Sequence, residues 1–248
     1  MAAIYVLWLR EIKRYTRSPI QIVISLAQPL FYLLILGFGL SPVFQKAGGG
    51  SYLQFIAPGI IGMSILFSAI FSGMGLLWDR QFGFLKETLV APIPRHRIMI
   101  GRTLGGASVA VIQGTLVMII CVIAGFRPFS VTSVPAAFLF MLLIATVFGA
   151  LGTAIGSVLK DMQGFQMIMT FMVMPIFFLS GALFPLTNLP SALGILTSLD
   201  PLAYGVDGLR CSLISASHFG ATMDIAVLAG TASLFIALGT YCFSRIEI

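Results

Sequence analysis

The chain has 248 residues, of which 58% are hydrophobic and only 9% are charged, and its mean hydropathy is +1.05. This composition indicates an integral membrane protein and excludes an ordinary soluble domain. Lysine and arginine outnumber aspartate and glutamate by 14 to 8. They cluster at the ends of apolar runs instead of along one solvated face, so we expect no nucleic-acid partner.

The chain begins with a segment that has two faces. Tyr5, Trp8, Ile12 and Tyr15 recur at spacings of three and four residues, while basic residues occupy the other side. This pattern is typical of an amphipathic helix that lies in the membrane interface. The alternative is a basic flank that only sets the topology. Ser18-Pro19 ends the helix before the first span.

Six uncharged stretches are each long enough to cross a bilayer as an α-helix. The predicted spans are residues 22–40, 55–77, 103–126, 136–159, 162–184 and 225–244. With the N-terminus inside, eleven lysines and arginines face the cytoplasm and three face outward, so both termini are predicted to be cytoplasmic. The expected fold is an all-α, six-span membrane domain covering residues 1–248.

The longest polar segment, residues 78–102, follows the second span. It contains a predicted cytoplasmic helix over residues 82–91, which Pro92 and Pro94 end. Its apolar edge and adjacent charged pair are formed by Phe82, Leu85 and Leu89, and by Lys86 and Glu87. Such a helix fits a groove in a partner protein. Lying flat on lipid is the equally compatible alternative.

The segment between the fifth and sixth spans predicts two short outer helices. The first begins near Pro190 and ends at Leu199. Asp200 and Pro201 are an N-cap and a first-turn proline, and they open a second helix that runs to Leu213. These helices are too apolar for a solvated loop, so we expect them to pack over the bundle or to re-enter the outer leaflet.

The fifth span carries a polar stripe near its inner end. Gln163, Gln166 and Thr170 lie at helical spacing, and Met174 belongs to a crowd of methionines before the kink at Pro175. Flexible thioethers suit a path for varied apolar cargo. Ordinary core packing is the alternative interpretation.

Small residues form stripes on three other spans, and such stripes let helices approach closely. Each stripe could pack against another helix of the same protomer or against a second protomer. Their members are Ser64, Ser68 and Ser72; Ala145, Gly149, Gly152 and Gly156; and Ala226, Gly230, Ser233 and Ala237.

The sequence lacks the motifs of an enzyme. None of its four lysines follows a glycine, so it contains no Gly-Lys-Ser/Thr phosphate loop and cannot be its own ATPase. It also lacks a Gly-x-Ser-x-Gly elbow, a His-Glu-x-x-His motif and the cysteine spacing of a metal site. A secondary carrier usually holds its coupling ion on an ionisable residue within the spans, and the predicted spans have none.

Two segments resemble known sequences. Residues 79–95 (DRQFGFLKETLVAPIPR) and 179–185 (LSGALFP), with Leu189-Pro190, Asp200-Pro201, Tyr204 and Arg210 further on, are similar to ABC-2 type permeases, especially the daunorubicin-resistance-like branch. The resemblance implies one half of an exporter in a bacterial plasma (inner) membrane. A second copy and two cytoplasmic ATPase subunits, which bind ATP and Mg²⁺, would complete it.

The resemblance also implies roles for individual residues. The helix containing Phe82, Leu85, Lys86, Glu87 and Leu89 would couple the permease to its ATPase. The outer helices would form a gate, whose residues are Pro190, Asp200, Pro201, Tyr204 and Arg210. Family substrates include drugs, lipids and polysaccharides. The alternative classes are a carrier or channel that works without an ATPase and a membrane scaffold or assembly subunit that does not transport.

Overall fold

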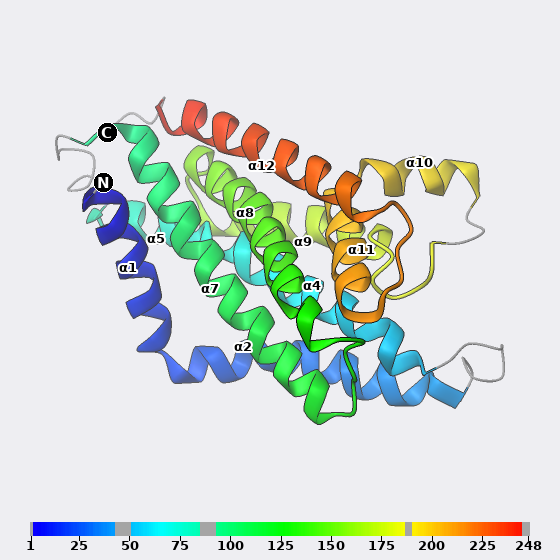
Figure 1. Ribbon diagram of the computed structural model, residues 1–248. Helices are drawn as coiled ribbons and strands as arrows, with labels where there is room; N and C mark the ends of the chain where they lie inside the picture. Colours follow the sequence, from blue (N-terminus) through cyan, green and yellow to red (C-terminus); the bar gives the residue numbers. More distant parts are fainter. Residues whose placement is uncertain (1, 43–50, 85–92, 187–189, 245–248) are drawn as a thin grey trace.

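The computed structural model describes residues 2–42, 51–84, 93–186 and 190–244, and within these ranges it contains helices and no strand. The elements are α1 (Ala2–Thr16), α2 (Pro19–Tyr32), the π-helix η1 (Leu33–Phe38), α4 (Tyr52–Ser72), α5 (Met74–Gln81), α7 (Arg95–Ile123), the 3₁₀ turn η2 (Val131–Ser133), α8 (Val134–Val158), α9 (Met162–Leu179), α10 (Ser191–Leu199), α11 (Pro201–Ile214) and α12 (Ala221–Ser244) (Figure 1).

Six helical stretches among the described residues are long and apolar enough to cross a membrane, as predicted. They cover residues 19–38, 52–81, 95–123, 134–158, 162–179 and 221–244. Most of these helices begin before the predicted uncharged run, and near their ends they bury Asp79, Arg102 and Asp224. The fifth helix stops at Leu179 instead of residue 184, since Gly181 adopts a left-handed φ of +70°.

The core of the bundle is formed by α4, which packs against both α7 and α8. Within the most apolar window of each span, 72% of the α4 residues are buried, against only 17% in the α2–η1 stretch and in α12, and 22% in α9. The start of α1 and the end of α12 lie at one end of the bundle and α10 lies at the other (Figure 1). The three poorly buried spans therefore leave large apolar faces for lipid or another copy.

The N-terminal helix α1 packs along α7 (Figure 1). Leu7, Glu11 and Tyr15 are buried, whereas Tyr5 is exposed. The face of α1 that packs on α7 is therefore rotated from the stripe of Tyr5, Trp8, Ile12 and Tyr15, which is only partly covered by the protein. Close approach is possible because Gly105 faces Glu11, where an added Cβ would lie 2.8 Å from the Glu11 Cβ.

Arginine side chains bind carbonyl groups at the C-terminal ends of two helices. These contacts lie on the side of the bundle where α1 begins and α12 ends. Arg80 donates to the Leu159 carbonyl at 3.1 Å, just after α8. Arg95 donates to the Ser244 carbonyl at 2.6 Å, at the end of α12. Cationic side chains satisfy the free carbonyls of a helix C-terminus. The positive charges at this end of the bundle thus also hold its helices together.

The small-residue stripe of α8 packs inside the protomer. Gly152 lies against the backbone at Ile70, and Gly156 lies against Gly73. The α12 stripe differs, because an added Cβ at Gly230 would meet nothing within 4 Å of the described chain. Internal packing is therefore confirmed for α8, while the α12 stripe is left for a partner or lipid.

Candidate functional site

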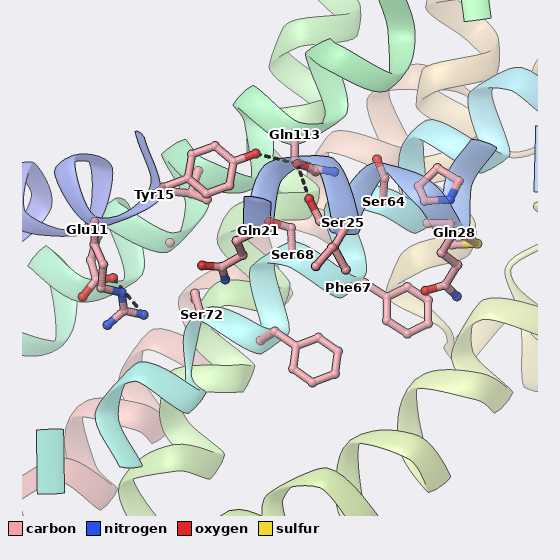
Figure 2. Close-up of a pocket in the computed structure, with 17 residues that line it drawn as sticks. Glu11, Tyr15, Gln21, Ser25, Gln28, Ser64, Phe67, Ser68, Ser72 and Gln113 are labelled. Atoms are coloured by element: carbon pink, nitrogen blue, oxygen red, sulfur yellow. Dashed lines mark hydrogen bonds and ion pairs between the residues drawn. The ribbon is translucent and has the colours of Figure 1, made fainter. Parts of the chain in front are cut away.

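A cavity of about 360 Å³ lies among α1, α2, α4 and α7 (Figure 2). Its wall combines aromatic and aliphatic side chains with uncharged polar groups from all four helices. The polar groups include Tyr15, Gln21, Ser25, Gln28, Ser68 and Gln113. The serine stripe of the second span was recognised in the sequence, but as helix packing. Its role as a cavity wall depends on Gln21, Gln28 and Gln113 lying opposite it, which the sequence pattern did not reveal.

Gln113 joins three of these helices. It is only 2% exposed, and its Oε1 accepts the Tyr15 hydroxyl at 2.6 Å and lies 3.1 Å from the Ser25 Oγ (Figure 2). Burial raises the pKa of Tyr15 above its usual value of 10, so this hydroxyl keeps its proton and donates it. The Gln113 Nε2 has no hydrogen-bond partner among the described residues. A buried amide left unpaired costs about 1–3 kcal/mol.

A charged cluster joins α1, α5 and α7. Asp79, which is 4% exposed, receives hydrogen bonds from Arg10, at 2.6 Å, and from Arg102, which is 5% exposed. The cluster ties the last turn of α5 to α1 and α7. The sequence assigned Arg10 and Arg102 only to the positive-inside count, since pairing between distant helices leaves no periodic signal.

The segment proposed to contact an ATPase follows α5 directly. Phe82 stacks on Trp78 with a centroid separation of 5.6 Å, and Gly83 has a left-handed φ of +81°. A helix beginning at Phe82 is therefore wrong, because Phe82 caps α5 and the chain turns at Gly83. The other predicted coupling residues, Leu85, Lys86, Glu87 and Leu89, lie outside the described residues.

The two short helices predicted between the fifth and sixth spans are confirmed as α10 and α11. Pro190 occupies the N-cap position of α10. Asp200 caps α11 by accepting the Leu202 N–H at 2.9 Å, and Pro201 is its first residue. The Tyr204 hydroxyl donates to the Ser198 carbonyl at 2.9 Å and so ties α11 back to α10. The residues assigned to the outer gate thus lie in one hydrogen-bonded unit.

Arg210 connects this unit to the spans. Its guanidinium donates to the Gly181 carbonyl at 2.6 Å, just past the end of α9, and lies 4.1 Å from the ring centroid of Phe55. Burial lowers the pKa of Arg210 from 12.5 to about 10, opposed by the nearby Asp207 charge. Arg210 therefore remains a cation near neutral pH, and it holds α11 against α9 and α4.

Asp200 gives the unit formed by α10 and α11 a pH-dependent stability. Burial raises the pKa of Asp200 from 3.8 to about 7, with the Leu202 N–H opposing the shift. The folded protein holds this proton more tightly than the unfolded chain does. The free energy of unfolding should therefore fall as the pH rises from about 4 to about 7. Asp200→Asn keeps the capping oxygen without the charge. The fall in the thermal unfolding midpoint from pH 5 to pH 8 should therefore be smaller in this variant than in the wild type. Equal declines would contradict the assignment.

The polar stripe of the fifth span faces away from the protomer core. Gln163, Gln166 and Thr170 are exposed and Met174 is partly exposed, whereas Phe165 and its neighbours on the opposite face are buried. Core packing within the protomer therefore does not account for the three polar residues.

Comparison with known proteins adds a family relationship. The profile of the ABC-2 type transporter family matches residues 2–214. The inner membrane transport permease YadH of Escherichia coli (strain K12) is 29% identical over 246 residues, covering 97% of this chain and 93% of YadH. Nodulation protein J of Bradyrhizobium diazoefficiens is 30% identical over 220 residues, covering 85% and 82% of the two chains.

Proposed function

The chain belongs to the ABC-2 type transporter family, and we propose that it is the permease subunit of an exporter driven by a separate ATPase. The sequence contains no Gly-Lys-Ser/Thr motif, so ATP and Mg²⁺ would be bound by the partner chain. The excess of basic residues at one end of the bundle supports placing both termini in the cytoplasm. The proposed location is the inner (plasma) membrane of a bacterium.

The observation that carries this proposal is the Arg10–Asp79–Arg102 cluster. It anchors the end of α5, immediately before the segment that we propose contacts the ATPase. Because the anchor is buried, a force on that segment would reach α1 and α7 instead of bending α5 alone. The neighbouring α1 residues Glu11 and Tyr15 line the cavity. A movement of α1 would therefore change the interior of the permease.

A second copy would complete the proposed transport path. The exposed polar stripe Gln163, Gln166 and Thr170, with Met174, lies on a helix that its own protomer barely covers. We place this stripe at the contact between two protomers, where it would line a path for a drug-like, lipid-linked or polysaccharide-like substrate. The unit containing Pro190, Asp200, Pro201, Tyr204 and Arg210 lies at the opposite end from the termini and would gate the outer opening.

The ATPase contact can be tested with the double variant Leu85→Ala, Leu89→Ala and with Glu87→Ala. An apolar anchor removed from an interface commonly costs about 2 kcal/mol, which corresponds to roughly 30-fold weaker binding. We expect the variants to insert normally but to lose co-purification with the ATPase and substrate-stimulated ATP hydrolysis in vesicles.

Phe129→Ala is a suitable control. Phe129 is a highly exposed aromatic residue in the connection between α7 and α8, away from the segment that we propose contacts the ATPase. It should leave complex formation unchanged. Full coupling in the Leu85, Leu89 and Glu87 variants would refute the assignment of this segment. Transport that continues without any ATPase would instead favour a carrier or channel.

A further inference from the structure

The function proposed above assigns no ligand to the cavity among α1, α2, α4 and α7. We propose that it binds an uncharged amphiphile, whose hydroxyl- or amide-bearing head group pairs with Gln113 and whose apolar body lies against Phe67 and Phe71 (Figure 2). The site is built within one protomer, and it is separate from the exposed stripe on α9 and from the outer helices.

The unpaired amide of Gln113 can donate a hydrogen bond to a ligand that carries an acceptor. The Oε1 atom of Gln113 is directed to Tyr15 and Ser25, so the amide orientation is fixed by neighbours on α1 and α2. This leaves the Nε2 donor without a partner among the described residues, on a side chain that is almost fully buried and lines the cavity. Buried donors in proteins are normally satisfied.

The lining also excludes a strongly charged head group. Around Gln113, the polar wall consists of glutamine amides and serine hydroxyls, which both donate and accept hydrogen bonds. The acid and the base on the lining, Glu11 and Arg14, lie 3.6 Å apart at its α1 end and neutralise each other. An ionic head group next to Gln113 would lose its hydration without an opposite charge among these amides and hydroxyls. Uncharged hydroxyl groups match this wall best.

The apolar part of the lining and the position of the opening indicate where the apolar body of the ligand lies and from which side the ligand enters. Phe67, Phe71 and Met63 provide apolar surface on α4. Ile24 on α2 and Phe71 on α4 line the cavity and are also exposed on the protomer surface, so the cavity opens between these two apolar spans. A ligand entering there would come from the membrane, with its polar head directed inward to Gln113 and its chain toward the lipid.

The test is equilibrium binding of radiolabelled octyl glucoside, below its micellar concentration, to the permease in phosphatidylcholine nanodiscs. We expect saturable binding, at least tenfold tighter than that of octyltrimethylammonium or octyl sulfate, which share the chain but carry a charge. Gln113→Leu should weaken glucoside binding about tenfold. Because no ATPase is present, the result does not depend on the proposed exporter function.

Two further variants make the result specific. Ser68→Phe should fill the cavity and abolish binding while retaining the Gln113 contacts with Tyr15 and Ser25, so it tests the site even if Gln113→Leu folds poorly. Gln81→Leu is the matched control, since it removes an exposed amide from the end of α5, outside the cavity lining, and should bind like the wild type. Absence of saturable binding, equal binding of the charged probes, or wild-type binding by Ser68→Phe would each overturn the proposal.

Discussion

Replacement of Asp79 by alanine is expected to destabilise the permease by about 3–5 kcal/mol, because it leaves the buried Arg102 guanidinium without its counter-ion. Arg102 lies on α7 and is only 5% exposed, so its guanidinium is almost fully shielded from water. The expected readout is a large fall in the thermal unfolding midpoint of the purified protein in nanodiscs, with a lower yield of monodisperse material.

The two arginines of the cluster should not be equivalent. The Arg10 side chain is 38% exposed, so Arg10→Gln should cost no more than about 1 kcal/mol, as is usual for an ion pair in contact with water. The double variant Asp79→Leu, Arg102→Met removes both buried charges and should regain most of the stability lost in Asp79→Ala. If Arg10→Gln were as damaging as Asp79→Ala, the buried pair would not be the main source of stability.

The features that the sequence predicted correctly are those with a local physical signal. An uncharged run of about 20 residues has few stable alternatives to a membrane helix, so the six spans could be located from composition alone. Asp200 followed by Pro201 supplies a helix N-cap and a first-turn residue, so the start of α11 could also be predicted from the sequence. Neither inference requires knowledge of which helices become neighbours.

The features that were missed depend on tertiary neighbours. The periodicity of α1 indicated an apolar face, but the presence of α7 decides which face is buried. The Asp79–Arg102 pair and the Gln113 contacts join different helices, and no spacing within one helix reveals such a pair. Gly83 could have indicated that the helix after the second span starts later than Phe82, since glycine readily adopts a left-handed φ at a helix end.

Gly152 provides the clearest test of how the spans pack. A Cβ added there would lie 2.8 Å from the Ile70 Cα and would clash with the Ile70 carbonyl oxygen, and backbone atoms cannot move aside as a side-chain tip can. Overpacking in a protein core commonly costs about 1–3 kcal/mol. Because the added methyl group of Gly152→Ala meets backbone atoms, we expect a cost at the upper end of this range. Gly152→Leu should exceed it and prevent accumulation of folded protein.

The matched substitutions at Gly230 separate packing within a protomer from association between protomers. The space around Gly230 is open in the described structure of one protomer, so Gly230→Leu should leave the thermal unfolding midpoint of the protomer within a few degrees of the wild type. The oligomeric state, measured by size-exclusion chromatography with light scattering, should change only if the α12 stripe contacts a second copy. Because the glycines of α8 are occupied by Ile70 and Gly73, Gly152→Leu should reduce folding itself. A stably folded Gly152→Leu protein with an altered oligomeric state would show that α8 faces another protomer, which would contradict the packing described above.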